Sequence, residues 1–252
     1  MRIGILGAGG MADALGTQWA RAGHEVMVSG RNESSGATRA KTMTAALATT
    51  PGEVRPTSSG GPEEVGAGSS SGPGEVRPGS RGGPGEVRSG SFAEVAAFGE
   101  VVVVAVREAG LADTLRATGT ALRGKPLIDV VNTADIFAYD PTRPIARLIA
   151  DVTGGHVVKA FNLCNVDVWR MTPPVFDGRP LAVPLCGDDQ EALDAARTLV
   201  TALGCTPVDG GGLDRAMLLE ATAAFVIGLW FGGADAQAIL PPLASSGAHR
   251  RT

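Results

Sequence analysis

Short apolar runs alternate with longer amphipathic stretches along most of the chain. RIGIL at residues 2–6 predicts a short buried strand, and the stretch after it places Leu15 and Trp19 on one helical face, with Gly23 as the stop. HEVMVS at residues 24–29 predicts a second strand. This order of strand, helix and strand predicts an α/β fold with a parallel sheet.

The alternation continues through the middle of the chain. The stretch GEVRSGSFAEVAAFGEVVVVAV predicts a short strand, a short helix and then, at Val101–Val106, a strand that is almost wholly β-branched. That composition is expected of a central parallel strand buried on both faces. Further strands are predicted at residues 126–131 and 156–160, which completes a doubly wound parallel sheet.

The last third of the chain predicts a small α/β lobe. Strands are expected at residues 181–186 and 206–209, with a helix between them. Asp188 and Glu191 have the spacing of a capping box at the start of that helix. Its apolar stripe comprises Leu193, Ala196, Val200 and Leu203.

Residues 216–231 predict a helix that is apolar nearly all round and is interrupted by Glu220. This helix is shorter than the ~20 residues that a membrane span needs. We therefore expect it to be buried against the other lobe or against a second copy of the chain. The second possibility predicts a homodimer without a membrane partner.

From Pro51 the sequence falls into four blocks of eleven residues, each containing the pattern PxEV. The first three blocks offer only one Val each, and their Pro and Gly content excludes a helix. They carry too little apolar surface to offset the entropy of ordering, so residues 51–83 are predicted to be a disordered insertion in a surface loop. A partner-binding role for the repeats is the alternative.

Charge and cysteine content narrow the functional classes. A formal net charge of −4 over 252 residues argues against a nucleic-acid partner. The N-terminus MRIGILGAGG lacks the regions of a signal peptide, so a cytoplasmic protein is expected. The three cysteines are widely spaced and fit neither a disulfide framework nor a CxxC metal site.

A glycine-rich turn follows the first predicted strand. Its first Gly permits the tight turn, its second lets the backbone approach a pyrophosphate, and the following helix N-terminus offers unpaired N–H groups. In this strand–turn–helix context the motif predicts a dinucleotide site of the Rossmann type, with a structural turn in another doubly wound fold as the alternative. The GxGxxG/A motif comprises Gly7, Ala8, Gly9, Gly10, Met11 and Ala12.

The end of the second predicted strand favours NADP over NAD. An NAD site usually places Asp or Glu there to accept from the ribose 2′-hydroxyl, but this chain has no acid before Glu33. The Arg31 guanidinium can instead pair with a 2′-phosphate through charge-assisted hydrogen bonds. The residues predicted to bind this end of the cofactor are Ser29, Gly30, Arg31 and Asn32.

Ligands of open α/β sheets bind beyond the carboxyl ends of the strands. The residues that end the later strands are therefore candidates for the nicotinamide and substrate side of the site. Asn132 and Asn162 could instead make turns, and Phe161 could belong to the core. The candidates are Val106, Arg107, Asn132, Thr133, Lys159, Phe161, Asn162 and Leu163.

Several motifs together, IGILGAGGMA, GHEVMVSGRN, VVVVAV, LIDVVNT, HVVKAFN, LCGDD and DGGGLDRAMLLE, carry a family resemblance. The chain resembles the NADP oxidoreductases that depend on coenzyme F420, whose NADPH-binding domain recurs in the six-transmembrane metalloreductases. Pyrroline-carboxylate reductases share the N-terminal pattern. The resemblance covers nearly the whole chain outside residues 51–83.

The resemblance implies a Rossmann domain at residues 1–165, a small C-terminal domain at 166–240 that closes the substrate cleft, and a tail at 241–252. Hydride would pass directly between NADP(H) and the deazaflavin F420 in that cleft, so no catalytic acid or base is required. By position, the glycine turn faces the pyrophosphate. Arg31 and its neighbours face the adenosine phosphate, and the later strand ends border the hydride-transfer pocket.

Two other functions stay open. The first is an NADPH-dependent reductase of a small imine or carbonyl intermediate, which would need a proton donor. His156 starts its strand at the wrong end, which leaves Lys159 as the candidate donor. The second is a non-catalytic NADP-binding sensor. Hydrolytic and metal chemistry have little support, and Cys164 is the one cysteine beside the predicted pocket.

Deleting residues 51–83 is expected to leave a protein that folds and binds NADPH with an unchanged Kd, because the insertion is predicted to lie in a surface loop. Circular dichroism and a fluorescence titration with NADPH check this. Loss of cofactor binding in the deletion variant would show that the repeats contribute to the site.

Overall fold

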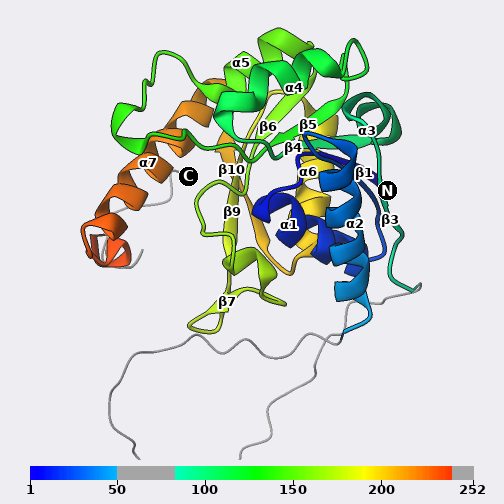
Figure 1. Ribbon diagram of the computed structural model, residues 1–252. Helices are drawn as coiled ribbons and strands as arrows, with labels where there is room; N and C mark the ends of the chain where they lie inside the picture. Colours follow the sequence, from blue (N-terminus) through cyan, green and yellow to red (C-terminus); the bar gives the residue numbers. More distant parts are fainter. Residues whose placement is uncertain (50–82, 240–252) are drawn as a thin grey trace, which may run out of the picture.

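The computed structural model describes residues 1–49 and 83–239. The predicted repeat insertion, apart from its last residue, and the predicted tail lie outside this range. The described residues form one eight-stranded sheet with the order β10-β9-β6-β5-β4-β1-β2-β3, and a short hairpin of β7 (Val175–Phe176) and β8 (Arg179–Pro180). Helices cover both faces of the large sheet (Figure 1).

Six strands of the large sheet are parallel and confirm the predicted doubly wound α/β fold. Strands β9 (Ala182–Cys186) and β10 (Thr206–Gly211) extend the same sheet, with β9 antiparallel to β6. The division of the chain into domains near residue 165 stays a prediction. The parallel strands are β1 (Arg2–Leu6), β2 (Glu25–Ser29), β3 (Val87–Ser89), β4 (Val101–Val104), β5 (Pro126–Asp129) and β6 (His156–Lys159).

The direction of the crossovers places the helices on two faces. Three helices bury their apolar side chains in one core, and three in the core on the opposite face. The first group is α1 (Gly10–Arg21), α2 (Glu33–Leu47) and α6 (Gln190–Ala202). The second group is α3 (Phe92–Phe98), α4 (Leu111–Ala117) and α5 (Ile145–Thr153).

Strand β4 lies in the middle of the sheet and serves both cores. Val101 and Val103 belong to one core, and Val102 and Val104 to the other, as the period of two in a strand requires. The predicted strand continued to Val106, but the ladder ends at Val104. The chain turns there because the carbonyl that follows, at Ala105, abuts the glycine turn after β1.

The predicted capping box at the start of α6 is wrong. The N-cap of α6 is Asp189, whose side chain accepts a hydrogen bond of 2.9 Å from the Ala192 N–H. Asp188 instead accepts from the Leu213 N–H at 2.8 Å and so joins the turn after β9 to the turn after β10. The spacing of Asp188 and Glu191 predicted the cap. The hydrogen bond with Leu213, which is distant in sequence, instead determines where the Asp188 side chain points.

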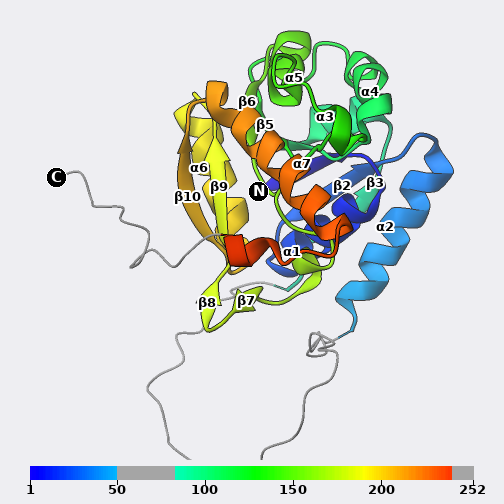
Figure 2. The ribbon, with the colours of Figure 1, turned by 90° about the vertical axis from the view of Figure 1, so that its left-hand side faces the viewer.

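Helix α7 (Ala216–Phe231) has the predicted range but buries only part of its surface within the chain. The helix packs beside α5 and η2 (Ile136–Ala138), and Figure 2 shows it crossing in front of the sheet. Its exposed apolar side chains are Leu218, Phe225, Trp230 and Phe231.

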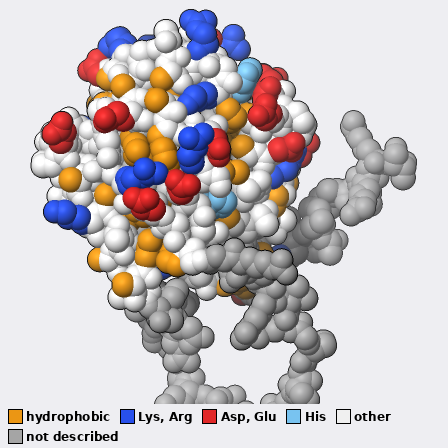
Figure 3. All heavy atoms as spheres, turned by 90° about the vertical axis from the view of Figure 1, so that its right-hand side faces the viewer, with side chains coloured by type: hydrophobic (Ala, Val, Ile, Leu, Met, Phe, Trp, Pro, Cys, Tyr) orange, Lys and Arg blue, Asp and Glu red, His pale blue; other side chains and the backbone are white. Residues whose placement is uncertain are grey.

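No helix in the described part of the chain is long and apolar enough to span a membrane. On the face seen in Figure 3, basic and acidic side chains are interspersed rather than gathered by sign.

Candidate cofactor site

The turn after β1 has a shape that requires glycine. Gly7 has φ +123°, and a Cβ added to it would lie 2.3 Å from the Ala105 carbonyl oxygen. Its N–H donates to the Ser29 carbonyl at 3.0 Å, which holds the turn against the end of β2. The structure therefore contains the tight turn predicted from the motif, and a residue with a Cβ would clash at Gly7.

The start of α1 is open toward the space above this turn. Gly9 is the N-cap of α1, is exposed, and caps no N–H with a side chain. A Cβ at Gly9 would meet no atom within 4 Å, so the protein itself does not fill that space. Unpaired N–H groups and the positive end of the helix dipole make this a place for a phosphate. Beneath them, Ala12 is buried and lets α1 pack closely on the sheet.

The loop after β2 lies beside this helix start, because Leu6 and Ser29 are in register as the last residues of β1 and β2. Arg31 is exposed there. Ser29 is fully buried and its hydroxyl donates to the Ile5 carbonyl at 3.3 Å, so it faces the sheet. The Asn32 side chain accepts from the Ser35 N–H at 2.9 Å as the N-cap of α2. Arg31 thus presents the free cation of this loop.

The ends of β5 and β6 are joined by two asparagines. The Asn132 amide donates to the Asn162 carbonyl at 2.7 Å, and the Asn162 amide donates to the Asn132 side-chain oxygen at 3.2 Å and to the Leu219 carbonyl of α7 at 3.0 Å. The Asn162 Oδ1 is buried and has no partner in the described residues. An unpaired buried acceptor is rare in folded proteins.

Phe161 forms a rigid wall beside these asparagines. Its φ of 59° is unusual for a residue other than glycine. Its ring makes edge-to-face contacts with Trp19, at 5.8 Å between centroids, and with Trp169, at 5.3 Å. Phe161 is therefore buried in the core, which was the alternative to a place in the strand-end site, while Leu163 beyond it is half-buried.

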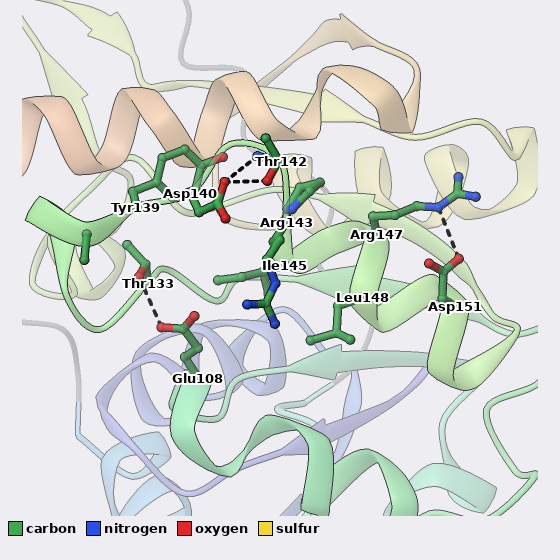
Figure 4. Close-up of a pocket in the computed structure, with 12 residues that line it drawn as sticks. Glu108, Thr133, Tyr139, Asp140, Thr142, Arg143, Ile145, Arg147, Leu148 and Asp151 are labelled. Atoms are coloured by element: carbon green, nitrogen blue, oxygen red, sulfur yellow. Dashed lines mark hydrogen bonds and ion pairs between the residues drawn. The ribbon is translucent and has the colours of Figure 1, made fainter.

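The loops after β4 and β5 are tied together. Glu108 accepts from the Thr133 hydroxyl at 3.1 Å and from the Ala134 N–H at 2.8 Å, next to the exposed Arg107 and the half-buried Val106. These loops border a cavity of about 410 Å³. Figure 4 shows Glu108 and Thr133 on one side of it, and Arg143 and Tyr139 from the segment that leads into α5 on the other.

Lys159 does not reach this cavity. Its side chain is fully buried, and its ammonium group lies 2.9 Å from Asp129 Oδ2 and 3.4 Å from Glu220 Oε1, and also donates to the Val131 carbonyl. Burial raises the pKa of Asp129, and the nearby Lys159 opposes that shift. This placement removes Lys159 from the side chains that can meet a substrate.

Glu220 is a second buried charge that the sequence marked as an interruption but gave no role. It accepts from the Ile145 and Ala146 N–H groups at 3.0 Å each, and so caps the start of α5 from α7. The Tyr139 hydroxyl, which lines the cavity, lies 3.4 Å from the same carboxylate. Burial and the Glu220 charge raise the pKa of Tyr139 to about 12, so the hydroxyl keeps its proton at neutral pH.

The remaining candidate groups do not form a second reactive centre. Burial raises the pKa of Cys164 to about 11, which keeps the thiol protonated and unreactive. His156 begins β6, at the amino edge of the sheet, as predicted. Residues 1–49 and 83–239 contain no cluster of His, Cys, Asp and Glu that could hold a metal ion.

These features fit a dinucleotide. The space above Gly9, the uncapped start of α1 and the exposed Arg31 provide for a pyrophosphate and a 2′-phosphate.

Comparison with known proteins agrees with this geometry. The model of the family "NADP oxidoreductase coenzyme F420-dependent" matches residues 2–133. The rat metalloreductase STEAP3 is 30% identical over 138 residues, which are 54% of this chain and 28% of the rat protein. The chain thus spans less than a third of that relative.

Two solved structures share the fold. One, from Arthrobacter sp. FB24 and described as an F420-dependent NADP reductase, is 25% identical, covers 92% of this chain and 95% of its own, and has a TM-score of 0.66. An imine reductase from Streptomyces aurantiacus is 14% identical, covers 92% of this chain and 62% of its own, and has a TM-score of 0.57. The family match extends over just more than half of the chain, so this protein belongs to the coenzyme F420-dependent NADP oxidoreductase family.

Proposed function

We propose that the protein transfers hydride directly between NADP(H) and the deazaflavin F420. The observation that carries this proposal is the position of Lys159, the candidate proton donor predicted from the sequence. Its ammonium group is buried in ion pairs with Asp129 and Glu220. The nicotinamide end is otherwise built from amides and an aromatic wall. Hydride transfer between two stacked rings requires orientation and exclusion of water more than acid–base catalysis.

Each part of the site then has a defined task. When bound, NADPH supplies the hydride, that is, two electrons and one proton. The glycine turn and the start of α1 hold its pyrophosphate, and Arg31 holds its 2′-phosphate. The Asn132–Asn162 pair holds the ends of β5 and β6 together beside the nicotinamide. The buried Phe161 keeps that wall of the pocket fixed.

The second candidate is reduction of a small imine or carbonyl compound, which needs a proton as well as a hydride. Tyr139 is the candidate proton donor, because it lines the cavity and stays protonated at neutral pH; its hydroxyl donates to the Met217 carbonyl at 2.9 Å. The shared fold with an imine reductase is compatible with this function. A sensor that binds NADP without turnover is the third possibility.

We further propose that a second copy of the chain covers the exposed side of α7, which carries Leu218, Phe225, Trp230 and Phe231. The one charged side chain of this helix, Glu220, is buried, so the exposed surface is apolar and requires an apolar partner. Phe137 in η2 is 82% exposed and lies beside Gly228, which extends the same surface. A twofold dimer needs only one self-complementary surface, which this helix offers.

The purified protein is expected to oxidise NADPH only when F420 is present, with one F420 reduced for each NADPH consumed. The visible absorption of the deazaflavin and the absorption of NADPH measure the two together. Turnover with a cyclic imine but not with F420 would contradict the proposal and favour the second candidate. NADPH binding without reduction of either compound would favour the third possibility, a sensor that binds NADP without turnover.

Arg31→Ala is expected to raise the Kd for NADPH about tenfold to hundredfold and to leave the Kd for NADH unchanged, because only NADPH carries the 2′-phosphate. Fluorescence titration with both nucleotides measures this. Arg116→Ala on α4, which removes an exposed ion pair with Asp113, is the matched control. Equal weakening of NADPH and NADH by Arg31→Ala would refute the assignment.

Phe225→Asp is expected to convert a dimer into a monomer of 25.5 kDa, because it places a charge in the apolar surface of α7. Light scattering after gel filtration gives the mass. Val152→Asp changes a similarly exposed side chain on α5 and is expected to leave the dimer intact. A wild-type protein that elutes as a monomer would refute the dimer.

A further inference from the structure

A carboxylate at the start of α1 joins two arginines from opposite sides of the cofactor site. Asp13 lies in the first turn of α1, and its side chain is 13% exposed. One oxygen lies 2.9 Å from Arg39 Nη1 on α2, and the other lies 2.7 Å from Arg170 Nη1 on η3 (Val168–Arg170). Arg39 comes from the adenosine side, and Arg170 from the segment that follows the nicotinamide side.

Arg39 also holds the glycine turn. Its Nε donates to the Ala8 carbonyl at 2.9 Å, while Nη1 of the same guanidinium pairs with Asp13. The planar guanidinium presents these donors in a fixed fork, which the single ammonium group of a lysine cannot reproduce. Arg39 therefore fixes the orientation of the Ala8 peptide relative to the start of α1.

Arg170 holds the segment after β6 against the same helix. The Gln18 side chain of α1 donates to the Arg170 carbonyl at 2.9 Å. Val166 packs over Gly10, since a Cβ added to Gly10 would lie 3.3 Å from Val166 Cγ2. The segment that begins at Phe161–Leu163 thus lies against the first turns of α1.

The charges of this group do not oppose an anionic ligand. A lone carboxylate in the first turn of α1 would repel a phosphate bound at that helix start. The two guanidinium groups neutralise Asp13, and Arg170 also pairs with Asp167 at 3.4 Å, so the group as a whole carries no net charge. The carboxylate can therefore connect two segments without opposing the cofactor.

We propose that Arg39, Asp13 and Arg170 form a positioning bridge that fixes the glycine turn relative to the segment after β6. This inference rests on the cofactor position proposed above. The bridge sets the spacing between the places for the pyrophosphate and for the nicotinamide. Arg39 acts through the Ala8 carbonyl and not on the 2′-phosphate, so it serves NADPH and NADH alike.

Arg39→Met and Arg39→Lys test the adenosine side of the bridge. Each is expected to raise the Kd for NADPH and the Kd for NADH by the same factor of about ten, measured by fluorescence titration. The lysine variant keeps the charge but loses the fork, so it is expected to behave like the methionine variant. Arg31→Ala, which acts on NADPH alone, provides the contrast.

Arg170→Met tests the other side. It is expected to raise the Kd for NADPH about threefold to tenfold and to leave the Kd for 2′,5′-ADP unchanged, because that fragment does not reach the segment after β6. Arg197→Met, which removes an ion pair of 2.6 Å with Asp194 on α6, is the matched control and is expected to change neither affinity. Thermal melting by circular dichroism confirms that each variant folds.

Three results would overturn the bridge. Wild-type affinity in Arg39→Lys would show that charge alone matters. Selective loss of NADPH in Arg39→Met would make Arg39 a 2′-phosphate ligand. Equal loss of 2′,5′-ADP and NADPH in Arg170→Met would show that the two sides are not distinct. If the wild-type protein binds neither NADPH nor NADH, the proposed cofactor position fails first, and the bridge with it.

Discussion

The fully buried ammonium group of Lys159 must be neutralised where it stands, and this requirement organises the carboxyl edge of the sheet. An unpaired charge in the interior destabilises the folded state by roughly several kcal/mol, even after the structure relaxes. The partners come from the end of β5, through Asp129, and from α7, through Glu220. Glu220 also caps the start of α5. The need to neutralise Lys159 therefore fixes the ends of β5 and β6 relative to α5 and α7, at the edge where we propose that the nicotinamide binds.

Local patterns in the sequence were sufficient for the fold, while the residues of the site stay a prediction. The strands that are buried on both faces, the glycine turn and the exposed Arg31 each follow from residues close together in the chain. Parallel strands end at one edge, so their terminal residues could be grouped before the structure was known. What local patterns left undetermined is which of those side chains point outward.

Two kinds of information are absent from the sequence alone. The helices that cover both faces of the sheet bury Lys159 and Ser29, although both stand at predicted strand ends. Contacts such as Asp13 with Arg170, which are 157 residues apart, have no spacing rule that could predict them. The two ends of the site differ in consequence. The adenosine end offers an exposed cation, whereas the nicotinamide end consists of buried groups already bonded to one another.

The position of the repeats along the chain has a consequence for the history of this protein. Helix α2 returns from the carboxyl edge of the sheet to the amino edge, and the described chain resumes at Gly83 beside the start of β2, where the Gly85 N–H donates to the Ala20 carbonyl at 2.7 Å. Both anchor points therefore lie at the edge opposite the glycine turn. Slippage during DNA replication can therefore change the copy number of the eleven-residue unit there without displacing the strand ends at the carboxyl edge of the sheet.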